Sequence, residues 1–259
     1  MDKVLVADSP GQILIAWVSH HLPGPNGELV GGAEMSDAIL LQDPPVDVMV
    51  FNPNNWEGAL DFEQVVITGT DALDPWAMTQ LAKKKPAVLV HHKQTRTKYR
   101  ANLISNAKVF LARTPRHLEL EKEWAQPKKS SWVLSPLDIN EFSIKPKLDF
   151  ALWAGRWHYQ KGPDEAIKWA EERKLKLVML RDKPRSEVLE AMSVAKYFVF
   201  LPNEFDAEPR AVIEAVMSGC EIHTNELAGI TSVPNWRKPE VLAELLKNSK
   251  RLFWEAVLE

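Results

Sequence analysis

This chain has little cysteine, little net charge and no long apolar run, and each absence excludes a class of protein. Cys220 is the only cysteine among 259 residues, which excludes an internal disulfide and a zinc site built from several cysteines. The net charge is −3, and no strongly basic block favours nucleic acid as the main partner. No apolar run approaches the roughly 18 residues of a membrane-spanning helix. The first residues lack the features of a signal peptide, so we expect a cytoplasmic protein.

Apolar runs alternate with helical stretches along the whole chain, which is typical of α/β folds with parallel sheets. Residues 135–148 interrupt this alternation with two prolines and charges of both signs, as an interdomain linker does. We therefore expect two βα domains, at residues 1–140 and 141–259, with a helical C-terminal segment from Pro239. The expected strands cover residues 13–18, 46–51, 64–68, 87–90, 108–112, 132–134, 150–153, 175–180, 197–201 and 221–223.

Two acidic residues follow the apolar strand expected at residues 197–201. Asp206 lies in the loop, and Glu214 lies eight positions later in a helix that has Pro209 in its first turn. Ligands of open parallel sheets bind at the carboxyl ends of the strands. A carboxylate at Glu214 can accept hydrogen bonds from two sugar hydroxyls, although a helix with one exposed glutamate gives the same pattern.

Two cations occupy another expected strand-to-helix turn. Arg156 and Lys161 are five positions apart, and each has a glycine beside it, Gly155 and Gly162 respectively. Glycine allows the backbone to approach a ligand closely, and arginine and lysine donate charge-assisted hydrogen bonds to phosphate. A solvated basic turn is the alternative. One cationic and one anionic turn within a single βα array favour a ligand that carries both phosphate and hydroxyl groups.

Together, these segments resemble the GT-B glycosyltransferases, in particular the large retaining family four that uses nucleotide-sugar donors. Gly31 and Gly32 look like the family's glycine loop beside the donor phosphates. His92 looks like the strand-end histidine near the donor sugar, with His91 as the neighbouring alternative. The resemblance implies two Rossmann-like domains that face each other across a cleft, followed by a C-terminal helix.

The cationic turn and the acidic pair match two further motifs of this family. Arg156 and Lys161 correspond to its diphosphate-binding cations, and Asp206 and Glu214 correspond to its paired acids. Asp206 stands where the family usually has glutamate. Arg210 departs from the family's small apolar residues before the helix, and we include it in the donor-binding set.

The resemblance implies transfer of a sugar from a nucleoside-diphosphate sugar to a carbohydrate, lipid or protein acceptor, with retention and without a metal or other cofactor. The expected catalytic residues are Arg156, Lys161, His92 and Asp206, and the expected donor-binding residues are Gly31, Gly32, Glu214 and Arg210. His20 and His21 are candidates for acceptor contact, and Trp157 for contact with a sugar ring. Contact with a membrane surface stays open.

Two other functions also fit the sequence. One is a degenerate module that binds a nucleotide sugar without transferring it, which the shorter acid at Asp206 makes plausible. The other is a sugar-nucleotide epimerase, an enzyme class with the same two-array architecture. The glycine loop and the paired acids favour the transferase.

Overall fold

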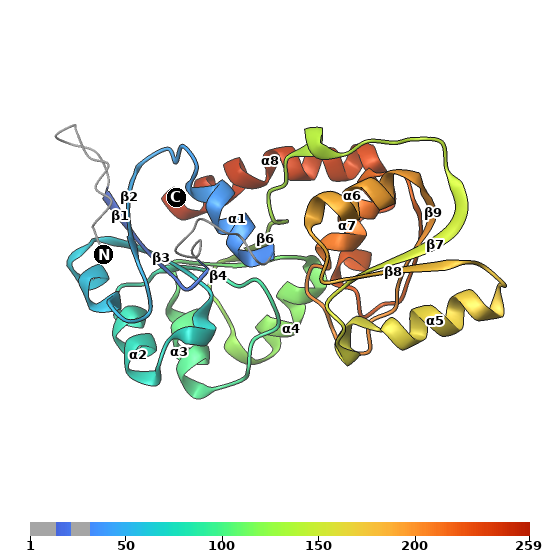
Figure 1. Cartoon of the computed structure of the whole chain (residues 1–259). Coiled ribbons are helices and arrows are strands. Elements are labelled where there is room, and N and C mark those ends of the chain that lie inside the picture. Colours follow the sequence, from blue (N-terminus) through green and yellow to red (C-terminus); the bar gives the residue numbers. More distant parts are fainter. Residues whose placement is uncertain (1–13, 22–31) are drawn as a thin grey trace. The chain divides into compact units, whose positions relative to one another are not determined.

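The computed structural model describes residues 14–21 and 32–259, and the chain divides into two compact units (Figure 1). Unit 1 comprises Met1–Leu137 and Asn248–Glu259, and unit 2 comprises Asp138–Lys247. Each unit has its own parallel sheet, with helices in the connections. The expected α/β class with two parallel sheets and a long C-terminal helix is therefore confirmed. The end of that helix belongs to unit 1, whereas the sequence-based division assigns residues 141–259 to one domain.

In the described part of unit 1, the sheet has six strands in the order β2-β1-β3-β4-β5-β6, and all neighbours are parallel. Along β1, alternate residues belong to two different core clusters, Ala16 and Val18 to one, Ile15 and Trp17 to the other. Burial on both faces explains why the strands are continuous apolar runs. The strands are β1 (Leu14–Ser19), β2 (Asp47–Phe51), β3 (Gln64–Thr68), β4 (Ala87–Leu89), β5 (Val109–Ala112) and β6 (Ser130–Trp132).

The helices of unit 1 cover both faces of this sheet. Helices α2 (Pro75–Lys83), α3 (Lys98–Asn106) and α4 (Pro115–Ala125) pack on one face, together with the 3-10 helix η1 (Trp56–Asp61). Helix α1 (Gly32–Leu41) and the end of α8 (Pro239–Leu258) pack on the other (Figure 1). Each of α2, α3 and α4 has an N-cap residue, whose side chain accepts a hydrogen bond from the backbone amide three residues later. The N-caps are Asp74, Thr97 and Thr114.

Helix α3 is not among the elements that the sequence pattern predicts. Its sequence is mostly polar, and only Arg100, Leu103 and Ile104 are buried. The Thr97 cap and packing against α2 and α4 therefore stabilise it more than an apolar stripe does. Strand β6 also begins earlier than expected, since Ser130–Trp132 pairs with Phe110–Ala112.

Unit 2 contains a four-stranded parallel sheet in the order β10-β9-β7-β8. Its core includes Trp153 on β7, Val199 on β9 and Trp169 on α5. The strands are β7 (Leu148–Gly155), β8 (Leu177–Arg181), β9 (Ala195–Phe200) and β10 (Glu221–Thr224). The helices are α5 (Pro163–Glu172), α6 (Arg185–Val194), α7 (Arg210–Met217) and the start of α8, with short 3-10 turns η3 (Ile139–Glu141), η4 (Tyr159–Lys161) and η5 (Gly229–Ser232).

The expected absence of a membrane span can be checked against the helices. Among residues 14–21 and 32–259, no helix has the length and apolar character that crossing a bilayer requires.

Candidate functional site

The cationic turn of unit 2 lies directly after the carboxyl end of β7. Gly162 has φ +62°, and a Cβ atom there would lie 1.8 Å from the carbonyl oxygen of Leu201, so only glycine fits. The Trp153 indole donates to the carbonyl of Lys161 at 3.2 Å, and the Asn203 amide donates to that of Gln160 at 3.2 Å. These contacts fix the backbone of the turn, so the side chains of Arg156 and Lys161 are presented from a rigid base.

Lys161 and Asp206 form an ion pair in this structure. The Lys161 Nζ lies 2.5 Å from the Asp206 Oδ2, and the two side chains are 38% and 17% exposed. The backbone of Asp206 is fixed because its amide donates to Leu227 and its carbonyl accepts from Gly229. Two expected site residues, 45 positions apart in the chain, are thus brought together at the carboxyl ends of the strands.

Arg156 differs from Lys161 because it is exposed and has no ion pair or hydrogen-bond partner among the described residues. Trp157, the next residue, is 44% exposed. Its ring lies 6.0 Å from that of Trp153, edge to face, and the Arg181 guanidinium from the end of β8 lies 6.0 Å from it. An exposed cation and an exposed aromatic ring therefore share the surface of this turn.

Glu214 is buried, with 4% exposure, and two arginines bind it. Arg185 Nε lies 2.9 Å from its Oε1, and Arg210 Nε lies 3.2 Å from the same oxygen. Arg185 also donates to Glu141 at 2.6 Å. Burial lowers the pKa of Arg185, but its hydrogen bonds with both carboxylates outweigh this and raise the pKa above the ordinary value.

This arrangement changes what Glu214 and Arg210 can do. Glu214 and Arg210, which the sequence led us to expect in the donor-binding set, are ion-pair partners one helical turn apart. Arg185 was not anticipated, because it comes from α6, 29 positions away. Arg185 is the first residue of α6, and nothing in the sequence around it indicates a contact with Glu214.

In unit 1, a polar cluster lies at the carboxyl ends of β1, β3, β4 and β5. Asp37 on α1 is fully buried and accepts hydrogen bonds from Ser19 at 2.9 Å and Thr68 at 2.5 Å. The Nε2 of His91 lies 3.0 Å from its other oxygen, Oδ1. Burial raises the pKa of Asp37, but the contacts with His91 and the two hydroxyls bring it below the ordinary value. Asp37 is therefore an anchoring carboxylate rather than an accessible one.

The neighbours of His91 determine its protonation. The fully buried Arg113 donates from Nη2 to the His91 Nδ1 at 2.7 Å and to Ser36 at 2.7 Å. Nδ1 must therefore accept, and Nε2 carries the proton that is donated to Asp37. Burial and the charge of Arg113 lower the pKa of His91 to about 4, so the imidazole is neutral at pH 7.

His20 and His21 extend this cluster. Their rings are 3.7 Å apart, and the ring of His21 lies 4.9 Å from that of His91. Burial and the neighbouring histidines lower the pKa of His21 to about 3. His20 Nδ1 lies 3.2 Å from the carbonyl oxygen of Gly69.

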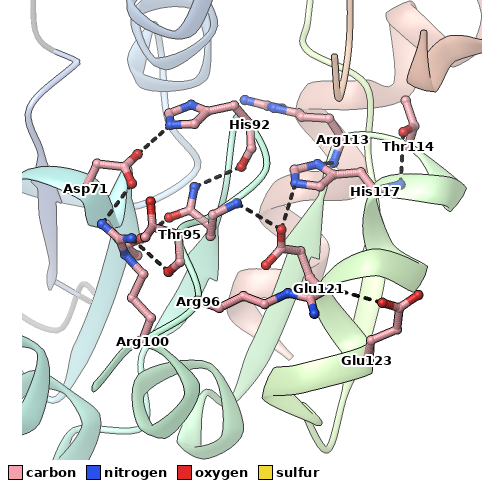
Figure 2. Close-up of polar contacts among 12 residues, drawn as sticks. Asp71, His92, Thr95, Arg96, Arg100, Arg113, Thr114, His117, Glu121 and Glu123 are labelled. Carbon is pink, nitrogen blue, oxygen red and sulfur yellow. Dashed lines mark hydrogen bonds and ion pairs between the residues drawn. The ribbon is translucent and has the colours of Figure 1, made fainter. Parts of the chain in front are cut away.

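His92 differs from the histidines of this buried cluster because it is accessible. Its side chain is 53% exposed, and its Nε2 lies 2.5 Å from Asp71, which also binds Arg100 at 2.9 Å (Figure 2). The hydrogen bond with Asp71 raises the pKa of His92. Gln94 donates to the His92 carbonyl at 2.8 Å, and the Gln94 amide donates to Glu121 at 3.0 Å. Of the two adjacent histidines, only His92 has a side chain that a ligand can reach.

The remaining expected residues belong to the glycine loop. Gly31 lies outside the described residues, and Gly32 is the first residue of α1. Within the residues that the structure describes, no group of three or more histidine, cysteine, aspartate or glutamate side chains is arranged to hold a metal ion.

No protein-family model and no curated protein sequence matches this chain. Solved structures, in contrast, match nearly all of it. Sucrose-phosphate synthase from Thermosynechococcus elongatus matches with a TM-score of 0.57 and 12% identity, over 95% of this chain and 94% of the other. The lipopolysaccharide outer core galactosyltransferase WaaB matches with a TM-score of 0.57 and 13% identity, over 94% and 91%. Anabaena HepE, in complex with UDP and glucose, matches with a TM-score of 0.54 and 11% identity, over 95% and 94%.

These identities are too low to show more than the fold, but the coverage of both chains is nearly complete. The resemblance inferred from the sequence motifs and the structural matches agree, and they do so without detectable sequence similarity to a family. The chain has the GT-B fold of these glycosyltransferases.

Proposed function

We propose that this protein is a glycosyltransferase that moves a sugar from a nucleoside-diphosphate sugar to a carbohydrate, lipid or protein acceptor, with retention and without a metal. The observation that carries the proposal is the rigid turn after β7, where Arg156 is unpaired among the described residues and Lys161 is paired with a partly exposed acid. The structures of HepE with UDP and with UDP-glucose support a donor of this class.

In this proposal, Arg156 and Lys161 stabilise the negative charge that develops on the departing diphosphate. Preorganised cations at a site of developing charge are usually the largest contribution to catalysis of this kind. Asp206 holds Lys161 in place before the donor binds, and then releases it in part to the diphosphate. The pair is partly exposed, so rearranging it costs less than breaking a buried ion pair.

Glu214 would bind hydroxyl groups of the donor while it keeps its arginine partners. The Nε atoms of Arg185 and Arg210 both contact Oε1 of Glu214. A carboxylate has two oxygens and about four acceptor positions, so a carboxylate that binds two arginine nitrogens can also accept from a hydroxyl. Arg185 and Arg210 then act as positioning residues, which hold the carboxylate at a fixed angle. His92 is proposed to position the sugar, as the resemblance implies.

The alternative function is a nucleotide-sugar-binding module without transfer activity. One observation favours it, namely that the Lys161 charge is already neutralised by Asp206. In a binding module that pair would stay closed, and only Arg156 would be available to the diphosphate.

A screen of donors tests both functions. The protein is heated with UDP-, GDP-, ADP- and dTDP-sugars, and a donor at 100 times its dissociation constant should raise the free energy of unfolding by about 2.7 kcal/mol. Release of the nucleoside diphosphate from the stabilising donor is then measured. A donor that stabilises the protein and whose nucleoside diphosphate is released supports the transferase. A donor that stabilises the protein but releases no nucleoside diphosphate, whichever acceptor class is added, supports the binding module. No stabilisation by any donor would contradict both.

A further inference from the structure

A cavity of about 510 Å³ lies in unit 1 at the amino-terminal ends of the strands, whereas the polar cluster lies at their carboxyl ends. Gln64 and Ala87, the first residues of β3 and β4, line it, as does Lys108 immediately before β5. The polar cluster instead follows the last residues of the same strands. The cavity shares no residue with the proposed transfer site, and its volume falls in the range of roughly 300–1,000 Å³ that is typical of ligand pockets.

The charges around this cavity are strongly unbalanced. Its lining contains Lys84, Lys85, Lys108 and Lys128, but only one acid, Glu63. Lys108 donates to the carbonyl of Val257 at 3.2 Å. The other three lysines make no ion pair with any described residue.

Two lysines just outside the lining have side-chain partners. Lys129 is paired with Glu259 at 2.5 Å, and Lys83 donates to Gln80 at 2.7 Å.

The negative ends of nearby helices offset only part of the positive charge of these lysines. Helices α2, α3 and α8 end beside the cavity, and each end carries about half a negative elementary charge. Together with Glu63, these ends offset roughly 2.5 of the four positive charges. The lining itself has four lysines and one acid, so its net charge is positive.

We propose that this lysine pocket, defined by Lys84, Lys85, Lys108 and Lys128, binds a phosphate-bearing anion. Ammonium groups are compact, charged donors that suit phosphate oxygens. The mobile stems of the unpaired lysines can converge on one anion without breaking an ion pair. The phosphate can belong to a free metabolite or to a lipid headgroup, since the recognising chemistry is the same.

The test must separate this pocket from the proposed donor site, which also attracts phosphate. Binding of inorganic pyrophosphate is therefore measured by calorimetry in an Arg156→Ala/Lys161→Ala background. In that background we expect binding to persist, and to weaken at least tenfold when Lys84→Gln, Lys85→Gln and Lys128→Gln are added. A matched control removes three exposed lysines of unit 2 instead, with Lys168→Gln, Lys238→Gln and Lys247→Gln, and should leave the binding unchanged.

A second arm distinguishes the two sources of phosphate. The same variants are sedimented with vesicles of phosphatidylglycerol and of phosphatidylcholine. Tight pyrophosphate binding without sedimentation assigns a soluble ligand, and sedimentation with phosphatidylglycerol alone, lost in the pocket variant, assigns a lipid headgroup. The proposal is overturned if neither probe binds in the Arg156→Ala/Lys161→Ala background, or if the control set reduces binding as much as the pocket set does. Melting curves of each variant show that it is folded, since all the substituted lysines are at least partly exposed.

Discussion

Replacing Arg156 with alanine should separate chemistry from folding more cleanly than any other change in the proposed site. The side chain is exposed and has no hydrogen-bond or ion-pair partner among the described residues, so its removal breaks no such bond with them. Surface substitutions of this kind usually change the free energy of unfolding by less than about 0.5 kcal/mol. A melting temperature close to that of the wild type is therefore expected.

The effect on turnover should be much larger. If Arg156 stabilises the departing diphosphate, its loss resembles the loss of a preorganised donor at a developing charge, on the order of 3 kcal/mol in the barrier. Turnover should then fall by about two decades, since each 1.36 kcal/mol is tenfold. Lys161→Ala is less clean, because it also leaves the Asp206 carboxylate without its partner.

The assay is initial-rate release of nucleoside diphosphate from the donor that stabilises the protein, with Arg116→Ala as the control. Arg116 is also an exposed arginine, and its pair with Glu119 on α4 is of the weak, exposed kind. Wild-type turnover in Arg156→Ala would refute the placement of the diphosphate on this turn. A large drop in melting temperature would refute the assumption that Arg156 has no structural role.

Glu214→Gln should weaken donor binding by about tenfold, or roughly 1.4 kcal/mol, and should also lower stability because two arginines lose a charged partner. Asp206→Asn should weaken donor binding less, and calorimetric titration of the donor decides between the two. Stability should fall as the pH drops from about 6.5 towards 4, because His21 and His91 stay neutral in the folded protein, with pKa values of about 3 and 4, while the unfolded chain binds protons. Urea denaturation at pH 7 and 5 measures this, and a flat profile would contradict the assigned burial. Activity should survive excess chelator, and loss restored by magnesium would exclude the metal-free mechanism.

The sequence was sufficient to predict most of the fold, because burial leaves a periodic signal. Strands such as β1 and β5 are buried on both faces and appear as continuous apolar runs. Helix α3 was not predicted because its signal is weak, with three buried residues in a polar segment. Its stability depends on a cap and on neighbouring helices, which a local pattern does not contain.

The candidate site was less predictable, because its contacts join distant segments. The turn that holds Arg156 and Lys161 could be located from its glycines and its flanking strand. The contact of Glu214 with Arg185 depends on how α6 packs on α7, and no local spacing encodes it. Likewise, adjacent histidines are equivalent in sequence, and their partners from distant segments distinguish them: Asp37 and Arg113 contact His91, and Asp71 contacts His92.

The ion pair of Lys161 and the ion pairs of Glu214 differ in burial, and this difference bears on how a donor could be accommodated. The pair of Lys161 with Asp206 is partly exposed, so a diphosphate can replace the carboxylate at a lower cost than in a buried pair. Glu214 is almost fully buried, and removing one partner of a buried ion pair costs roughly 3–5 kcal/mol. A donor should therefore exchange the first pair and leave the second intact. In the proposed mechanism, the arginines around Glu214 form a fixed frame, and the lysine of the neighbouring turn is the part that moves from protein to ligand.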